Sequence, residues 1–356
     1  MRPAAGSRST ARVAEEIVGS FADPIRLLGI QDYFVTLSVG IATHPRDGQT
    51  AADLLENARI AASHAKRADA ARYHFYSTRM NHVALERLTL EQRLRAALRR
   101  GELTLSYQCQ IDAATLRADG AEALLRWHHP ELGVLAPGEF LALAEETRQI
   151  VPIGDWVLRA ACRQAREWQS SIAPDFRIAV NVSAHQLCQP TFAELVREVL
   201  QAAQLGPESL ELEITESCIG NEERHGLDNL ERVRALGVRV SIDDFGTGYS
   251  SLANLKRLPV DALEIDRGFV QGVGRDSADT LIVAAITTLA RGLGLAVVAE
   301  GVETEPQLRA LTKQGCTRLQ GFLFGSPLPA QEFARALQAS PWKPLVEPEA
   351  DGDAAA

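Results

Sequence analysis

A regular alternation of short apolar runs and longer amphipathic stretches governs the sequence from Gly101 to about residue 340. Strand-like apolar runs occur at 103–108, 122–127, 177–182, 210–214, 238–242, 262–265, 296–299 and 317–320. Helical stretches lie at 191–204, 227–236, 277–293 and 305–314, and glycines follow them at Gly206, Gly237, Gly294 and Gly315. This alternation predicts a parallel α/β fold, and about eight strands favour a closed (β/α)8 TIM-like barrel over an open sheet.

Composition narrows the class of protein. With 356 residues, 46% hydrophobic and 23% charged, the chain can form one large domain and a smaller segment. The net charge of -9 argues against direct nucleic-acid or membrane-surface binding, although it permits a small phosphate ligand held by metal. No apolar run approaches ~18 residues, so we expect no membrane span. The five cysteines lack CxxC spacing, which indicates free thiols in a reducing cytoplasm.

Polar residues stand at the downstream ends of six of the predicted strands. They are Asn181, Glu213, Asp243, Glu264, Glu300 and Gln320. In a barrel these strand ends converge on one face, where active sites are built. Buried charged side chains are costly unless they bind something, and a set from separate strands is harder to dismiss than one surface acid. Carboxylate and amide oxygens suit Mg2+ or Mn2+ rather than zinc.

The stretch SIDDFGTGYSSL at 241–252 combines several features of a binding site within a few residues. Asp243 and Asp244 are adjacent acids at a strand end, and they repel each other unless a cation or a proton lies between them. Gly246 and Gly248 permit backbone angles that let the following loop fold tightly. An isolated Asp-Asp pair would be an N-cap and a solvated turn, but the other strand-end acids favour a binding site.

Several motifs resemble one known family. The sequence contains Glu122-Ala123-Leu124, NVSAHQL from Asn181, ELEITES from Glu211, DDFGTGYSSL from Asp243, AEGVET from Ala299 and QGFLFGSPLP from Gln320. In order and spacing, residues 86–333 resemble the EAL-domain family of cyclic-di-GMP phosphodiesterases. The resemblance implies hydrolysis of one phosphodiester bond of cyclic-di-GMP to give linear pGpG, in bacterial second-messenger signalling, by a protein that forms homodimers through the barrel.

The same resemblance implies a role for each site residue. The ligands of a first metal would be Glu122, Asn181, Glu213 and Asp243, with Asp244 serving a second Mg2+ or Mn2+. Glu300 would act as general base or as an additional metal-site carboxylate, and Gln320 would help to hold the site and its water. Gln108 and Arg126 would contact the cyclic dinucleotide, with Arg126 donating to phosphate. Glu216 and the loop at 244–251 would couple the metal site to a dimer partner.

One position departs from the family pattern. Where the family reads like LPVDxLKIDRSFV, this chain reads LPVDALEIDRGFV, so Glu264 replaces an active-site lysine. At ~5 Å and an effective dielectric near ~20, one charge contact is worth about 3 kcal/mol, so a reversed sign can slow the reaction by orders of magnitude. Glu264 could instead be another metal ligand, or be protonated and tolerated. Two functions therefore stay open: a phosphodiesterase, slowed or inactivated by Glu264, and an impaired module that binds cyclic-di-GMP as a sensor.

The remaining segments have simpler interpretations. Residues 1–80 resemble the C-terminal half of a GGDEF, or diguanylate cyclase, domain without its signature loop, so we expect a structural remnant with no cyclase activity. Residues 81–100 form a strongly amphipathic predicted linker helix, and the barrel domain follows at 101–340. The acidic, proline-containing tail at 341–356 is predicted to be disordered.

Overall fold

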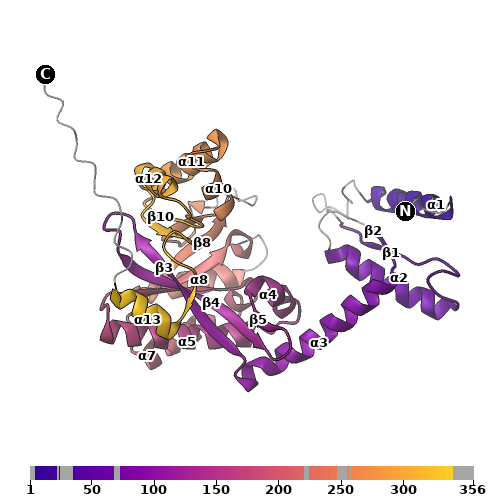
Figure 1. The fold of residues 1–356 in the computed structure, drawn as a ribbon, viewed down its shortest axis with the longest axis horizontal. Helices are drawn as coiled ribbons and strands as arrows, with labels where there is room; N and C mark the ends of the chain where they lie inside the picture. The colour runs from indigo at the N-terminus through magenta and orange to yellow at the C-terminus, as the bar shows by residue number, and fades with distance from the viewer. Residues whose placement is uncertain are drawn as a thin grey trace. The chain divides into compact units, whose positions relative to one another are not determined.

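The computed structural model describes residues 5–21, 24, 35–67, 73–219, 224–246, 255–256 and 258–339. The chain divides into two compact units, Met1–Arg93 and Leu94–Ala356, whose elements are labelled in Figure 1. The predicted disordered tail lies outside the described residues. Among the described helices, none combines the length and the apolar character needed to cross a membrane.

The first unit is small. It contains α1 (Ala5–Gly19), β1 (Val39–Ile41), α2 (Ala51–Arg67) and β2 (Tyr73–Phe75), and its two strands pair in parallel. α2 packs so closely on β1 that a Cβ added at Gly40 would lie 1.9 Å from the Ala58 carbonyl oxygen. The predicted linker helix is α3, which begins at Thr78 and ends at Arg100.

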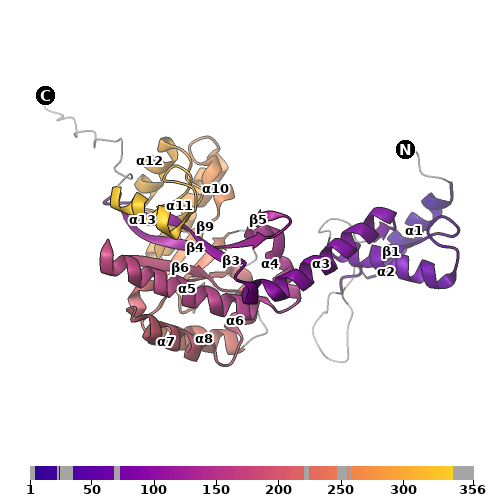
Figure 2. The ribbon, with the colours of Figure 1, turned by 60° about the horizontal axis from the view of Figure 1, so that its bottom comes forward.

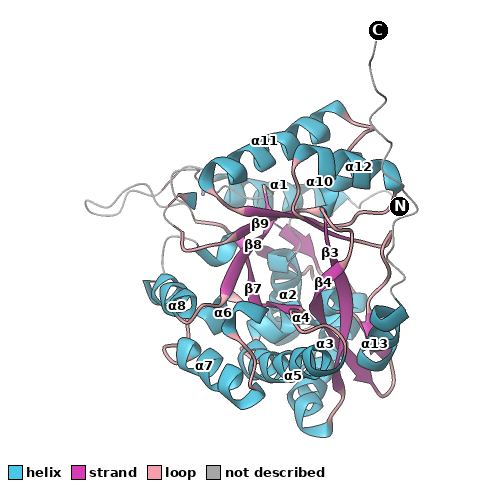
Figure 3. Ribbon diagram, turned by 90° about the vertical axis from the view of Figure 1, so that its left-hand side faces the viewer, coloured by secondary structure: helices cyan, strands magenta, loops and turns pink. Residues whose placement is uncertain are grey.

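The second unit is a closed barrel. All eight predicted runs are strands: β3 (Leu103–Asp112), β4 (Ala118–His129), β6 (Arg177–Asn181), β7 (Leu210–Thr215), β8 (Arg239–Phe245), β9 (Ala262–Ile265), β10 (Ala296–Ala299) and β11 (Arg318–Gln320). The ring closes because β3 pairs with both β4 and β11, and Figure 3 shows the strands encircled by helices. The short strands β5 (Gly133–Leu135) and β12 (Leu328–Pro329) pair with β4 and β3.

The barrel differs from the predicted all-parallel pattern at β3. This strand runs antiparallel to both of its neighbours in the ring, β4 and β11. β3 and β4 form a hairpin whose turn is closed by the Asp112 carboxylate, which accepts hydrogen bonds from the backbone N–H and the hydroxyl of Thr115. A parallel pair would need a crossover of a dozen or more residues, which this short turn cannot supply.

The helices cover the outside of the ring. They are α4 (Pro137–Glu146), α5 (Ile150–Ser171), α6 (Ala184–Leu187), α7 (Phe192–Ala203), α8 (Arg224–Ala235), α10 (Arg267–Gly272), α11 (Ser277–Leu293), α12 (Glu305–Gln314) and α13 (Ala330–Ala339), with short 3-10 turns at Pro207–Ser209 and Glu216–Ile219. α11 and α12 lie on the opposite side of the barrel from α7 (Figures 2 and 3). The predicted bounds of α11 and α12 agree with the structure.

The predicted glycines lie where the helices end, with one exception. Gly294 and Gly315 adopt left-handed φ values of 73° and 98° and end α11 and α12. The prediction for Gly206 is wrong, because α7 ends at Ala203 and its C-cap residue, Gln204, already adopts a left-handed φ of 54°. Leu205 is buried at 5% exposure and its N–H donates to the Leu200 carbonyl, so the chain turns before Gly206 is reached.

Candidate active site

The barrel gathers most of the predicted site residues inside one ring. Gln108 comes from β3, Glu122 from β4, Asn181 from β6, Glu213 from β7, Asp243 from β8, Glu264 from β9 and Gln320 from β11, while Glu300 follows β10 directly. Alternation along each strand sends these side chains inward, whereas the apolar residues between them pack against the helices. The site is thus assembled from eight strands that lie far apart in the sequence.

Amide side chains hold the Glu122 carboxylate. Asn181 Nδ2 donates to Glu122 Oε1 over 2.6 Å and to Glu213 Oε2 over 3.1 Å. Gln320 Nε2 donates to Glu122 Oε2 over 2.6 Å and to Gln108 Oε1 over 3.3 Å. These bonds join five of the predicted residues in one network on this side of the barrel.

Sequence reasoning missed Gln110. Its side chain is buried and its Nε2 lies 3.5 Å from Glu213 Oε1, so it faces the same carboxylate as Asn181. The available signal was strand alternation, since Gln110 lies two residues beyond Gln108 and therefore on the same face of β3.

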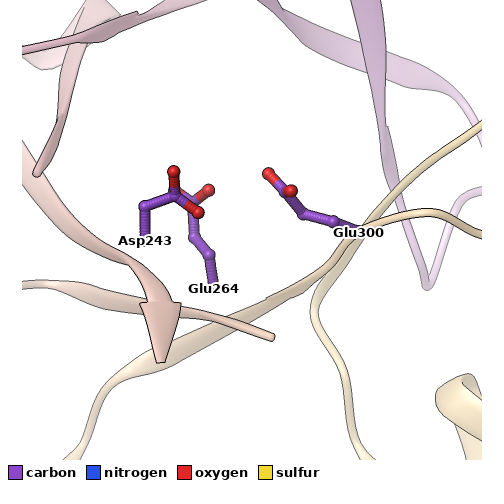
Figure 4. A group of neighbouring side chains, drawn as sticks. All are labelled: Asp243, Glu264 and Glu300. Carbon is purple, nitrogen blue, oxygen red and sulfur yellow. The ribbon is translucent and has the colours of Figure 1, made fainter. Parts of the chain in front are cut away.

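Three carboxylates form a second group. Asp243, Glu264 and Glu300 each offer an oxygen atom, and these atoms all lie within 4.8 Å of one another; the three side chains point toward a common centre (Figure 4). Glu264 is 0% exposed, and neither of its oxygens accepts a hydrogen bond from the described residues. The strand register of β9 therefore directs Glu264 into the site.

Burial and mutual repulsion perturb these acids. Burial raises the pKa of Glu264 well above its usual range, and the negative charges of Glu300 and Asp243 add to the rise. The pKa values of Glu213 and Glu300 also rise well above normal, again first through burial. Burial and the neighbouring Asp244 charge raise the pKa of Asp243 to about 7. The site is therefore a region that favours positive charge or bound protons.

Asp244 lies near the end of β8, where the pairing with β9 is irregular. It has a left-handed φ of 54°, and its backbone N–H donates to Asp243 Oδ1 over 2.6 Å. The next turn is tied to Glu216, whose carboxylate accepts from the Gly246 N–H over 3.4 Å. The predicted coupling loop beyond Gly246, at 247–251, lies outside the described residues.

Arg126 lies at the edge of the network. It is on the inward face of β4, four residues after Glu122, and is half-buried. Its guanidinium donates to the Leu125 carbonyl over 2.8 Å. Burial lowers the pKa of Arg126, which the Glu122 charge opposes, and no hydrogen bond joins it to the predicted ligands among the described residues. A donor free of carboxylate partners remains accessible to an anionic ligand.

A buried ion pair lies deeper in the barrel. Arg318 Nη1 contacts Glu211 Oε2 over 2.6 Å, and Arg318 Nε lies 3.8 Å from Asp119 Oδ2. Arg177 pairs with the same Asp119 carboxylate. Glu211 lies two residues before Glu213 on the same face of β7, so an arginine pairs directly with the inner of these two acids.

The residues present fit a divalent-cation site. The donor atoms are carboxylate and amide oxygens, which Mg2+ and Mn2+ prefer. The two oxygens of Glu264 are buried and accept no hydrogen bond from the part of the chain that the structure describes, so they are suited to a cation. Asn181 now presents its amide nitrogen to Glu122 and Glu213, and it would offer its oxygen to a cation after rotation of the amide group.

Fold and site together define the class: an α/β barrel with a carboxylate-rich site where its strands end. The family model described as EAL domain matches residues 91–327, and the chain belongs to this family. The chain is 47% identical over 323 residues to the bifunctional diguanylate cyclase/cyclic di-GMP phosphodiesterase MucR of Pseudomonas aeruginosa, covering 91% of this chain and 47% of MucR. It is 40% identical over 336 residues to the cyclic di-GMP phosphodiesterase NbdA of the same species, covering 94% of this chain and 43% of NbdA.

Solved structures agree with this assignment. The PaMucR phosphodiesterase, solved as a c-di-GMP complex, matches with a TM-score of 0.66 and 50% identity over 69% of this chain and 99% of that chain. The EAL domain of Mycobacterium smegmatis DcpA matches with a TM-score of 0.56 and 37% identity over 67% of this chain and 97% of that chain. The chain spans less than half of the length of the curated relatives MucR and NbdA. The half-GGDEF interpretation of residues 1–80 stays a prediction.

Proposed function

We propose that this chain hydrolyses cyclic-di-GMP to linear pGpG with the help of divalent cations, Mg2+ or Mn2+. The observation that carries the proposal is the set of inward side chains from eight strands, in a chain 50% identical to a phosphodiesterase solved with c-di-GMP. The reaction adds water across one phosphodiester bond, giving a terminal phosphate and a free hydroxyl.

Each residue has a task in this reaction. Glu122, Asn181, Glu213 and Asp243 would hold one cation and Asp244 a second. Bound there, the cations would neutralise phosphate oxygens and lower the pKa of water.

The side chains around these ligands would bind the substrate and move the proton. Arg126 would donate to a phosphate oxygen, because its guanidinium is not engaged by a carboxylate hydrogen bond, and Gln108 would contact the dinucleotide. Glu300 would take the proton of the attacking water or serve as a further cation ligand; burial raises its pKa, and a cation bound nearby would favour its ionised form. Gln320 would position Glu122 and the water.

A second candidate is a module that binds cyclic-di-GMP without cleaving it. The observation that favours this candidate is Glu264, whose carboxylate lies where the family resemblance places a lysine ammonium. An uncompensated carboxylate beside the phosphate would repel it and slow the attack.

Homodimerisation through the barrel is part of either proposal. So is a cytoplasmic location, which the five free cysteines favour.

The test is turnover of cyclic-di-GMP by the full chain in Mn2+, followed by chromatography of pGpG, with ligand affinity measured in parallel. We expect the natural chain to form pGpG and Glu122→Gln to lower the rate by at least about 100-fold, since a ligand should matter no less than an outer-shell group. The control is Glu305→Gln, which should retain activity, because Glu305 is a partly exposed acid on α12 that pairs with Arg309. Binding without cleavage, together with turnover gained by Glu264→Lys, would establish the binding module instead.

A further inference from the structure

Glu264 lacks the partner that a buried carboxylate needs. Its side chain is fully buried, and neither oxygen accepts a hydrogen bond from the described residues. Other buried acids in the barrel are satisfied: Glu122 accepts from two amides, and Glu211 pairs with Arg318. A buried ionised carboxylate without a donor or counter-charge is strongly disfavoured.

Among the described residues, the groups that most affect the pKa of Glu264 cannot supply a counter-charge. They are the carboxyl groups of Glu300, Asp243 and Glu211, which are all acidic, and the hydroxyl of Ser241, which carries no charge. The nearby buried arginine, Arg318, is already 2.6 Å from Glu211. Neutralisation must therefore come from bound protons or from a cation that enters the site.

The geometry suits a single cation. Two oxygens on opposite sides of Mg2+ lie about 4.2 Å apart, because each bond is about 2.1 Å long. The three carboxylate oxygens already lie within 4.8 Å of one another, so a shift of less than about 1 Å would bring them around one ion. The backbone of Glu264 is fixed by the sheet, because β9 pairs with β8 on one side and with β10 on the other. On β10, the residue opposite Glu264 is Val298, and Val298 precedes Glu300 by two residues.

We propose that Asp243, Glu264 and Glu300 together bind one divalent cation, so that Glu264 is a metal ligand in this chain. This inference rests on the proposed function, because the ion lies within the phosphodiesterase site. The cation restores positive charge at the position where the family resemblance has a lysine. Three carboxylates also give this chain a stronger electrostatic hold on the ion than two carboxylates beside an ammonium group would have.

The experiment is a Mn2+ titration of the metal-stripped full chain, with free Mn2+ followed by electron paramagnetic resonance and no dinucleotide present. Glu264→Gln keeps the shape of the side chain and removes its charge. We expect Glu264→Gln to weaken one Mn2+ site on the order of 10- to 100-fold, and Glu264→Lys to abolish that site. The control is Glu305→Gln, which removes one charge outside the cluster and should bind Mn2+ like the natural chain.

The outcomes separate this inference from the proposed function. Unchanged Mn2+ affinity and stoichiometry in Glu264→Gln would overturn the inference, with Glu264 then held neutral by a proton, and would leave the phosphodiesterase proposal intact. A natural chain that binds no Mn2+ yet forms pGpG in chelator would overturn the inference and the cation dependence of the proposed function, but not the hydrolysis itself. A natural chain that neither binds Mn2+ nor forms pGpG would overturn both. Unfolding curves in urea check that each variant is folded.

Discussion

At the residue scale, the acids inside this barrel differ in which neighbouring groups stabilise the negative charge of their carboxylates. Amides donate to Glu122, an arginine neutralises Glu211, and Glu264 has neither kind of partner among the described residues. Identical carboxylates thus have different chemistry, because the dielectric surroundings and the nearest charge set the proton affinity of each one. The lack of such a partner leaves the Glu264 carboxylate free to meet a cation.

The acid cluster should make the metal-free protein less stable as pH rises. The pKa of Asp243 is about 7 in the folded chain and near 3.8 when unfolded, so the folded state binds this proton more tightly. Its contribution to the free energy of unfolding is therefore fully present below about pH 4 and is lost as pH rises through about 7. Urea unfolding in EDTA between pH 5 and 8 measures this loss.

The matched variant for this prediction is Asp243→Asn, which has no proton to lose. Its free energy of unfolding should fall less steeply between pH 5 and 7 than that of the natural chain, by a difference of a few kcal/mol at most. Saturating Mn2+ should flatten the profile of the natural chain, since a bound cation favours the ionised form. Equal slopes for both proteins in EDTA would contradict the raised pKa.

At the element scale, the C-cap residue of helix α7 is of a type that does not suit its left-handed backbone conformation. Gln204 is exposed and left-handed, with φ 54°, a conformation that costs a residue with a Cβ about 1–2 kcal/mol. Gln204→Gly should therefore stabilise the barrel by up to about 1 kcal/mol, after the greater freedom of glycine in the unfolded chain is subtracted. The midpoint of urea unfolding measures the change.

The same substitution three residues earlier is the control. Gln201 is exposed but lies within α7 in a helical conformation, so Gln201→Gly should destabilise the barrel by about 1 kcal/mol. Opposite signs at the two positions would show that the backbone conformation, and not the glutamine side chain, decides the outcome. A loss of stability in Gln204→Gly would refute the capping argument.

At the scale of the whole molecule, an aromatic cluster joins distant parts of the chain outside the ring. Phe333 of α13 is 1% exposed, and its ring centroid lies 4.9 Å from that of Trp168 of α5 and 6.1 Å from that of Tyr107 of β3. Phe333→Ala should lower the free energy of unfolding by about 3–5 kcal/mol, because the rigid neighbours cannot fill the cavity. Denaturant unfolding of the barrel transition measures this loss.

Phe322→Ala is the matched control for Phe333→Ala. Phe322 is 59% exposed, and the guanidinium carbon of Arg267 lies 5.9 Å from its ring centroid. Its removal should therefore cost about 1 kcal/mol or less. Similar losses for both variants would mean that α13 does not close the barrel core.

The sequence by itself determined the strands, the ends of α11 and α12, and the inward set of strand-end acids. These features depend on local rules: alternation along a strand, glycine after a helix, and the cost of a charge in an apolar run. Those rules act over a few residues, so they can be applied without knowing which strands become neighbours. They also predicted that Glu264 faces the site.

Only the tertiary structure decided how the ring closes and what each acid meets. The pairing of β3 with β11, the approach of Gln110 to Glu213 and the pairing of Arg318 with Glu211 depend on contacts between residues about a hundred or more positions apart. Glu264 illustrates the difference. Its inward direction follows from strand period, but its lack of a partner follows from which side chains the closed barrel places around it.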